Sequence, residues 1–280
     1  MVSNGGSLLR LVVGGLVAAV LPIGLGVGSA RAGGVDEQHD VVYAPGVALD
    51  VFRPDELTAP APVVVIVHGG GWQTGSKESW ADEARELVAV TGWVAVTVEY
   101  DLDAVEPWVT QPGNVRAAIE WVRSNATALG ADAERIGLLG SSAGGHLSML
   151  VATTGAPVDV VVSWSGPSDL PLLVASPIGD QLVKDLAARY AGGTLDDVPA
   201  RWIEQSPVAN VDAGDPPMLL VASADETVVP ADQLTSMRDV LVAHDVEVET
   251  LVLAGTGHAS DFADRAWGRT VGFLRDHLED

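Results

Sequence analysis

Short apolar runs alternate with helical patterns along most of the chain. Residues 63–67 are apolar without interruption, which is typical of a central strand whose two faces are both covered. Further strand patterns lie at residues 94–98, 135–139, 158–163, 218–222 and 246–253, and helical patterns lie at residues 78–91, 111–129, 231–244 and 261–277. Strands that alternate with helices predict an α/β fold with a mostly parallel central sheet and helices on both faces. Ligands bind such sheets at the carboxyl ends of the strands.

The segment ahead of the first apolar run predicts a hairpin. Residues 40–43 and 49–52 have strand patterns and flank Pro45 and Gly46, two residues that favour a turn. We expect these two strands at an edge of the sheet.

One long connection interrupts the alternation. About fifty residues separate the strand that ends near Trp164 from the strand that starts at Met218, and a crossover needs far fewer. Residues 180–190 and 195–203 in this connection have helical patterns. We expect residues 168–212 to form a small lid over the strand ends.

The first 32 residues differ from the rest in composition. They contain no acidic residue, carry Arg10 ahead of an apolar run at residues 11–27, and end in Ala-Arg-Ala at residues 30–32. This pattern predicts a secretory signal peptide over residues 1–32, followed by one domain over residues 33–280. The alternative is an uncleaved membrane anchor, because the apolar stretch is nearly long enough to span a bilayer. We expect a secreted protein without stable membrane association after cleavage.

The net charge of the chain restricts the classes of partner that it can bind. Its 280 residues include 15 Lys and Arg against 38 Asp and Glu, which gives a formal net charge of -23. Such a surface repels nucleic acid and anionic membranes, so we expect no nucleic-acid partner. The chain has no cysteine and therefore no disulfide. No cluster of ligand residues in the sequence favours a metal site, and we expect no cofactor.

The sequence around Ser142 predicts a catalytic turn. Gly-Ser-Ser-Ala-Gly at residues 140–144 lies between the predicted strand at 135–139 and a helical stretch at 145–151. A Gly-x-Ser-x-Gly motif between strand and helix is typical of a nucleophile elbow, a turn so tight that only small residues fit beside the serine. The helix would direct its first amides toward an oxyanion formed at Ser142.

A nucleophilic serine needs a base, and the base needs a carboxylate that fixes its tautomer. His258 is the candidate base, since it lies in a glycine-flanked loop directly after the last predicted strand. Asp225 follows the strand at residues 218–222 and is favoured as the carboxylate, because an Asp at the start of the loop suits the geometry between strand and loop. Glu226 beside it is the alternative. Serine, acid and histidine in this order are typical of α/β-hydrolases.

A glycine-rich stretch follows the apolar run at residues 63–67 directly. His-Gly-Gly-Gly at residues 68–71 is the oxyanion-hole motif of lipases and esterases, in which glycines let backbone amides approach a carbonyl oxygen. We expect the amides of Gly70, Gly71 and Ala143 to stabilise the oxyanion.

Three tryptophans are candidates to line a substrate pocket. Trp72, Trp108 and Trp164 each lie at or near the carboxyl end of a predicted strand, where ligands bind. Of these, we expect Trp72 and Trp164 to contact the substrate.

Together these motifs resemble the esterase and lipase group of α/β-hydrolases. The resemblance is carried by His-Gly-Gly-Gly-Trp at residues 68–72, by Gly-Ser-Ser-Ala-Gly-Gly-His-Leu at residues 140–147 and by Asp225 with the following Val and Pro; it covers nearly all of residues 40–278. The chain is most similar to small-lidded carboxylesterases that include bacterial feruloyl and acetylxylan esterases, with hormone-sensitive-lipase-like esterases close by. The resemblance implies the α/β-hydrolase fold and a cofactor-free acyl-enzyme mechanism that uses Ser142, Asp225 and His258.

Two positions depart from the pattern of these relatives. Asp101 follows Tyr100 where the relatives usually carry Arg, and Asn114 stands where they often carry Asp. We expect a secreted serine carboxylesterase that acts on short acyl or aryl esters, either small molecules or polysaccharide-linked. An arylformamidase-like amide hydrolase, a serine peptidase and a non-catalytic binding protein on the same fold are the alternatives.

Overall fold

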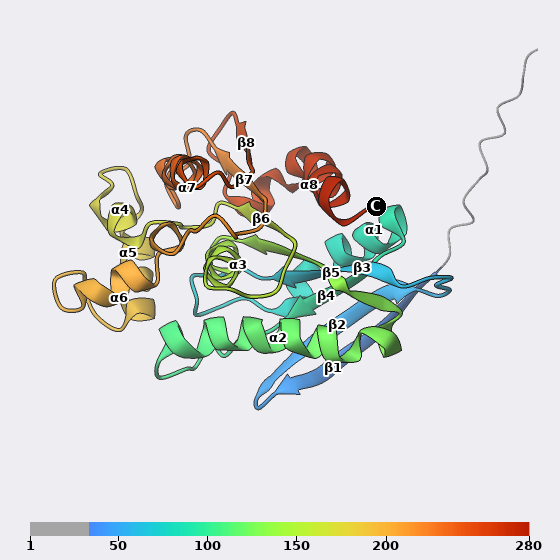
Figure 1. The fold of residues 1–280 in the computed structure, drawn as a ribbon. Coiled ribbons are helices and arrows are strands. Elements are labelled where there is room, and N and C mark those ends of the chain that lie inside the picture. The colour runs from blue at the N-terminus through green and yellow to red at the C-terminus, as the bar shows by residue number, and fades with distance from the viewer. Residues whose placement is uncertain (1–33, 280) are drawn as a thin grey trace, which may run out of the picture. The chain divides into compact units, whose positions relative to one another are not determined.

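Eight strands form one sheet in the computed structural model, which describes residues 34–279 (Figure 1). They are β1 (Val35–Ala44), β2 (Val47–Pro54), β3 (Ala61–Val67), β4 (Val94–Val98), β5 (Ala131–Ser141), β6 (Val160–Trp164), β7 (Met218–Ser223) and β8 (Val248–Leu253). Their order across the sheet is β1-β2-β4-β3-β5-β6-β7-β8. β1 is antiparallel to β2 and β2 to β4, whereas all other neighbouring strands are parallel. The mostly parallel sheet and the edge hairpin predicted from the sequence are confirmed.

β3 shows why its sequence is apolar throughout. Val63, Val65 and Val67 belong to the core on one face of the sheet, and Val64 and Ile66 belong to the core on the other. All five side chains are fully buried. Because successive side chains of a strand point to opposite faces, a strand covered on both sides needs apolar residues at every position.

Helices cover both faces of the sheet. The longer ones are α1 (Ala81–Thr91), α2 (Pro107–Leu129), α3 (Ala143–Thr153), α7 (Asp232–Ala243) and α8 (Ala263–Leu278). α1 and α8 pack on one face, and α2, α3 and α7 pack on the other (Figure 1). α2 begins four residues before the predicted start, at Pro107, because a proline is tolerated at the first helical position, where the missing N–H needs no helical acceptor.

Within the connection between β6 and β7, residues 168–212 are here called the lid segment, and they contain short helices that lie together (Figure 1). They are α4 (Leu170–Ala175), α5 (Gln181–Ala191), α6 (Pro199–Glu204) and the 3-10 turn η2 (Pro207–Ala209). The helices predicted at residues 180–190 and 195–203 correspond to α5 and α6. α4 was not predicted, since its six residues are too few to show a helical period.

Some predictions concern residues that the structure does not describe. The signal peptide predicted over residues 1–32 lies outside residues 34–279 and stays a prediction. Within the described part of the chain, no helix is long and apolar enough to cross a membrane. The same residues contain no group of three or more His, Asp or Glu side chains arranged to hold a metal ion.

Candidate active site

Ser142 occupies a strained turn between β5 and α3. Its backbone dihedrals are φ 51° and ψ -121°, a conformation that costs energy for a residue with a side chain. The neighbouring glycines are required by space: a Cβ on Gly140 would lie 2.3 Å from the carbonyl oxygen of Gly144, and a Cβ on Gly144 would lie 2.1 Å from that of Val67. The tight turn predicted from the motif is therefore present, with Ser142 at its tip.

Ser142 and His258 line the same cavity, which has a volume of about 430 Å³. Its walls come from the loop at residues 69–75, the start of α1 and the preceding turn η1 (Lys77–Trp80), α5 of the lid segment, and the loop that carries His258. This volume lies in the range of pockets that bind small molecules. The parallel strands thus bring the predicted nucleophile and the predicted base to the same cavity.

The carboxylate that holds His258 belongs to Glu226, and the prediction of Asp225 is wrong. Glu226 Oε1 lies 2.7 Å from His258 Nδ1, and the Glu226 side chain is fully buried. Asp225 is exposed, and its amide donates to the carbonyl oxygen of Gly255. β7 ends at Ser223 and the loop turns its next two residues toward solvent, so the first side chain that points inward is that of Glu226.

The Glu226 carboxylate is surrounded by donors. Besides the His258 bond, Oε1 accepts from the Val229 amide at 3.1 Å, and Oε2 accepts from the Ser165 hydroxyl at 2.6 Å and from the Ser223 amide at 3.4 Å. A buried charge is tolerated only when it is paired and hydrogen-bonded. These four contacts fix both oxygens, and the short bond to Nδ1 leaves His258 Nε2 free to accept a proton.

Ser165 is a member of this network that the sequence did not suggest. It is a buried residue with φ 48°, directly after β6, and its hydroxyl oxygen accepts from the Ala259 amide at 3.2 Å while it donates to Glu226. One hydroxyl therefore joins the carboxylate to the turn that follows His258. The only signal in the sequence is the position of Ser165 just past a strand's carboxyl end.

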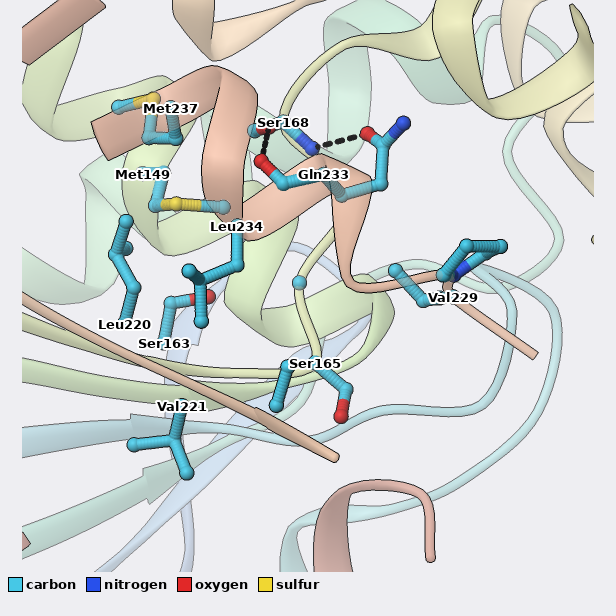
Figure 2. Close-up of a pocket in the computed structure, with 13 residues that line it drawn as sticks. Met149, Ser163, Ser165, Ser168, Leu220, Val221, Val229, Gln233, Leu234 and Met237 are labelled. Atoms are coloured by element: carbon cyan, nitrogen blue, oxygen red, sulfur yellow. Dashed lines mark hydrogen bonds between the residues drawn. The ribbon is translucent and has the colours of Figure 1, made fainter. Parts of the chain in front are cut away.

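Ser165 also borders a second, very small cavity between β6, β7 and α7 (Figure 2). Its volume is about 10 Å³, too small for anything larger than one water molecule. Gln233 closes it from the side of α7: its carbonyl oxygen accepts from the Ser168 hydroxyl at 2.6 Å, and its Oε1 accepts from the Ser168 amide at 3.0 Å. We interpret this cavity as a small gap in the packing beside the network, and it has no room for a substrate.

The glycine-rich loop after β3 is held in a fixed shape. Gly70 and Gly71 have φ 116° and 60°, values that suit glycine, and both line the cavity of Ser142. The carbonyl oxygen of Gly70 accepts from the amides of Gln73 and Thr74 and from the Thr74 hydroxyl. Ala143 is the first residue of α3, where amides have no helical acceptor. The role of the amides of Gly70, Gly71 and Ala143 in stabilising an oxyanion stays a prediction.

Trp72 lines the cavity but is largely inside the protein, with 2% of its surface exposed. Its indole N–H donates to His146 Nδ1 at 3.2 Å, and its ring stacks on Tyr190 of α5 with centroids 4.9 Å apart. His146 Nε2 donates to the carbonyl oxygen of Gln205 at 2.8 Å, which fixes the neutral tautomer. Complete burial lowers the pKa of His146 to about 4. This chain of contacts connects the glycine-rich loop, α3 and the lid segment.

The prediction that Trp164 contacts substrate is wrong. Its side chain is fully buried, its indole N–H donates to Thr270 of α8 at 3.0 Å, and it does not line the cavity of Ser142. The reason is that its position on β6 directs it to the face covered by α1 and α8. Trp108 is also outside the cavity and lies beneath the Arg201 guanidinium. Trp80 at the end of η1 lines the cavity instead, although no motif in the sequence marks it.

The two positions that depart from the relatives' pattern contact each other. The amide of Asp101 donates to the side-chain oxygen of Asn114 at 2.9 Å. Neither residue lines the cavity of Ser142. The departures therefore lie after β4 and in α2, outside that cavity.

Solved structures with the same fold come from esterases. A truncated carbohydrate esterase from gut microbiota superposes with a TM-score of 0.80 and 22% identity, over 90% of this chain and 99% of that one. A bacterial heroin esterase superposes with a TM-score of 0.74 and 23% identity, over 89% and 86%. At these identities the likeness shows the α/β-hydrolase fold, which confirms the predicted fold class.

Sequence comparisons agree with the motifs. Esterase LipC of Mycobacterium tuberculosis is 31% identical over 238 residues, which are 79% of this chain and 59% of LipC. LipM of the same organism, a probable carboxylic ester hydrolase, is 28% identical over 78% of this chain and 54% of its own length. The chain thus spans little more than half the length of these curated relatives.

The profile of the BD-FAE family matches residues 49–241, from β2 through most of α7. By this match over more than half of its length, the chain belongs to the BD-FAE family.

Proposed function

We propose that the protein hydrolyses carboxylic esters, with Ser142 as nucleophile, His258 as general base and acid, and Glu226 as the partner of His258. One observation carries the proposal: His258, held at Nδ1 by a buried carboxylate, lines the same cavity as the strained Ser142. The esterases among the relatives support the ester class.

The first half of the reaction acylates Ser142. Its Oγ attacks the ester carbonyl carbon while its proton passes to His258 Nε2, and the amides of Gly70, Gly71 and Ala143 stabilise the tetrahedral oxyanion. The bond from carbon to the alcohol oxygen then breaks, and the alcohol leaves with the proton from Nε2. Ser142 is left as an acyl ester.

The second half releases the acid. A water molecule attacks the acyl carbon while its proton passes to His258 Nε2, and the second tetrahedral intermediate collapses with return of that proton to Ser142 Oγ. Glu226 accepts the Nδ1 hydrogen bond throughout and stabilises the imidazolium that forms twice per cycle. No cofactor takes part in these steps.

The proposed substrates are esters with short acyl or aryl groups. A cavity of about 430 Å³ must hold both the acyl group and part of the alcohol, which favours small groups. The test is a set of initial rates of the wild type and Ser142→Ala on p-nitrophenyl acetate, butyrate and octanoate, beside methyl ferulate and acetylated xylan. We expect turnover of the short esters by the wild type and a loss of at least about 1,000-fold in the variant. A folded wild type that is inert on every ester, yet cleaves a formanilide or a prolyl anilide, would replace the proposal with an amidase or peptidase.

We further propose that the protein is exported and that residues 1–32 are removed. Support comes from the apolar run behind Arg10 and the Ala-Arg-Ala sequence at residues 30–32. The intact mass of the protein recovered from outside the expressing cell tests this: a chain that starts at residue 33 agrees with the proposal, and a full-length chain retained in the membrane fraction agrees with the anchor instead.

A further inference from the structure

One wall of the Ser142 cavity, here called the polar wall, carries a serine hydroxyl and a carboxylate beside a tryptophan. It is formed by Ser79 and Trp80 of η1 and by Glu83 of α1, and all three line the cavity. Ser79 and Trp80 precede Glu83 by four and three residues, the spacings at which side chains are neighbours on a helix. Among residues 34–279, no Lys or Arg side chain lines this cavity. Within the described residues, the carboxylate of Glu83 is therefore not paired with a cation that lines the same cavity.

Ring contacts connect this wall to the turn that follows His258. Trp80 packs on Trp164 with ring centroids 5.3 Å apart, and Trp164 packs on Phe262 at 5.8 Å. Phe262 ends the short turn η3 (Ala259–Phe262), which His258 directly precedes. Ser260 of the same turn lines the cavity as well.

The wall next to the glycine-rich loop is apolar. Leu182, Val183 and Leu186 of α5 line it, and Leu186 lies so close to Gly71 that a Cβ on Gly71 would come within 2.6 Å of Leu186 Cδ1. The amides expected to hold the carbonyl oxygen are therefore beside the lid segment.

The chemistry of the reaction assigns a substrate group to each wall. His258 must give its proton to the leaving alcohol, so the alcohol lies on the side of His258 and meets the polar wall. The acyl group then extends toward α5. Glu83 accordingly faces the alcohol.

Glu83 lies in the first turn of α1, where a carboxylate is favourable for the helix, and no printed contact explains why it also borders the cavity. It is half-buried and has no hydrogen bond or ion pair with any residue in the range 34–279, whereas its neighbour Asp82 pairs with Arg85 at 2.9 Å. A partly desolvated carboxylate repels a negative charge more strongly than an exposed one and accepts hydrogen bonds from hydroxyl groups.

On the basis of the proposed function, we propose that Glu83 determines the alcohol specificity of the enzyme. It selects esters of neutral, hydroxylated alcohols, whose hydroxyl groups donate to its carboxylate. It rejects alcohols that carry a negative charge.

A matched pair of substrates tests the rejection of charge. meta-Acetoxybenzamide and meta-acetoxybenzoate have the same acetyl group and leaving phenols of nearly equal size, and only the second is anionic. The measurement is the ratio of their kcat/KM values in wild type, Glu83→Gln and Glu86→Gln. Glu86 is exposed on the same helix and does not line the cavity, so its variant removes one negative charge at a distance.

We expect the wild type to prefer the neutral substrate and Glu83→Gln to reduce that preference about tenfold, while Glu86→Gln leaves it within about twofold. Because both substrates are measured on one protein preparation, a loss of folded enzyme cancels in the ratio. An unchanged ratio in Glu83→Gln, or equal changes in both variants, would overturn the assignment. A wild type inert on both substrates would contradict the proposed function itself.

A second pair tests the recognition of hydroxyl groups. Glycerol monoacetate and butyl acetate share the acyl group, and only the first offers hydroxyl donors. Glu83→Leu should lower kcat/KM for glycerol monoacetate relative to butyl acetate by about fivefold, and Glu83→Gln, which retains an acceptor, should lower it less. Equal effects on both esters in Glu83→Leu would contradict a contact between Glu83 and the alcohol.

Discussion

At the scale of single residues, the proposed reaction depends on how one buried carboxylate is held. Glu226 fixes His258 Nδ1 and is itself fixed by three further donors. Asp225, the residue before Glu226, is exposed to solvent and has no part in this network. Removal of the negative charge should therefore affect the reaction rate very differently at Glu226 and at Asp225.

Glu226→Gln should lower kcat on p-nitrophenyl acetate by roughly 1,000- to 10,000-fold, because an amide in place of the carboxylate favours the wrong tautomer of His258. Asp225→Asn makes the same chemical change one residue away and should keep kcat within about twofold. Steady-state kinetics of the two variants decide the point. A severe loss in Asp225→Asn with an active Glu226→Gln would restore the assignment made from the sequence.

Ser165→Ala should lower kcat about tenfold with KM within about twofold, because Glu226 Oε2 loses a donor and the turn after His258 loses its anchor. Ser223→Ala is the matched control, since the hydroxyl of this buried serine has no partner among the described residues. Kinetics and the pH profile of kcat should separate the two variants. Equal, small effects in both would mean that Ser165 only fills space.

These residues also mark the limit of prediction from sequence. Ser142, His258 and the glycines at positions 70 and 71 could be predicted because their chemistry demands a fixed local motif. The choice between Asp225 and Glu226 depends on the direction in which a loop turns after β7, and no local motif records that direction. Ser165 and Glu83 come from segments remote in the chain, so only the folded arrangement brings them to the site.

At the scale of elements, the glycine-rich loop is supported by α3 and the lid segment. The bond from Trp72 to His146, the stacking on Tyr190 and the bond from His146 to Gln205 form one continuous support. Trp72 also receives a bond at its carbonyl oxygen from Gln111 of α2 at 2.7 Å. The position of the amides at residues 70 and 71 thus depends on elements far apart in the chain.

Trp72→Phe keeps an aromatic ring and removes the N–H that His146 accepts. The unsatisfied Nδ1 should cost about 1 to 2 kcal/mol in the free energy of unfolding, and the looser loop should lower kcat several-fold. Urea unfolding and kinetics measure the two effects. Trp108→Phe is the control, because the indole N–H of Trp108 makes no hydrogen bond with residues 34–279 and Trp108 lies outside the cavity. A loss of kcat of the same size in Trp108→Phe would argue against the role of the Trp72 contacts in holding the glycine-rich loop.

Most elements could be predicted from the pattern of the sequence, and the exceptions have a common cause. β3, β4 and α7 are long or strongly apolar, so their periods are clear. α4 and the 3-10 turn before α1 are too short to show a period, and the face to which β6 directs Trp164 follows from its register with β5 and β7. Short elements and strand register are decided by tertiary packing.

At the scale of the whole described domain, a buried neutral histidine makes stability depend on pH. His146 has a pKa of about 4 in the folded state, compared with about 6.5 when exposed. The unfolded chain therefore binds the proton more readily, and acidification favours unfolding. The contribution is fully present above pH 6.5 and is lost as the pH falls toward 4.

The wild type should lose on the order of 3 kcal/mol more stability than His146→Gln between pH 7 and pH 4, at about 1.4 kcal/mol for each pH unit between the two pKa values. Glutamine can donate to Gln205 and does not titrate in this range. Urea unfolding of both proteins across this pH range gives the difference, in which the titration of other groups cancels. Parallel curves would show that His146 does not control acid stability.

Covalent labelling with an aryl fluorophosphonate tests the central claim most directly, since it reports the activated serine without a choice of substrate. We expect one equivalent of label on the wild type, located on the peptide that contains Ser142, and none on Ser142→Ala. Asp225→Asn should be labelled at the wild-type rate and Glu226→Gln at least about 100-fold more slowly. A folded wild type that takes no label, or takes it at a residue other than Ser142, would contradict the account.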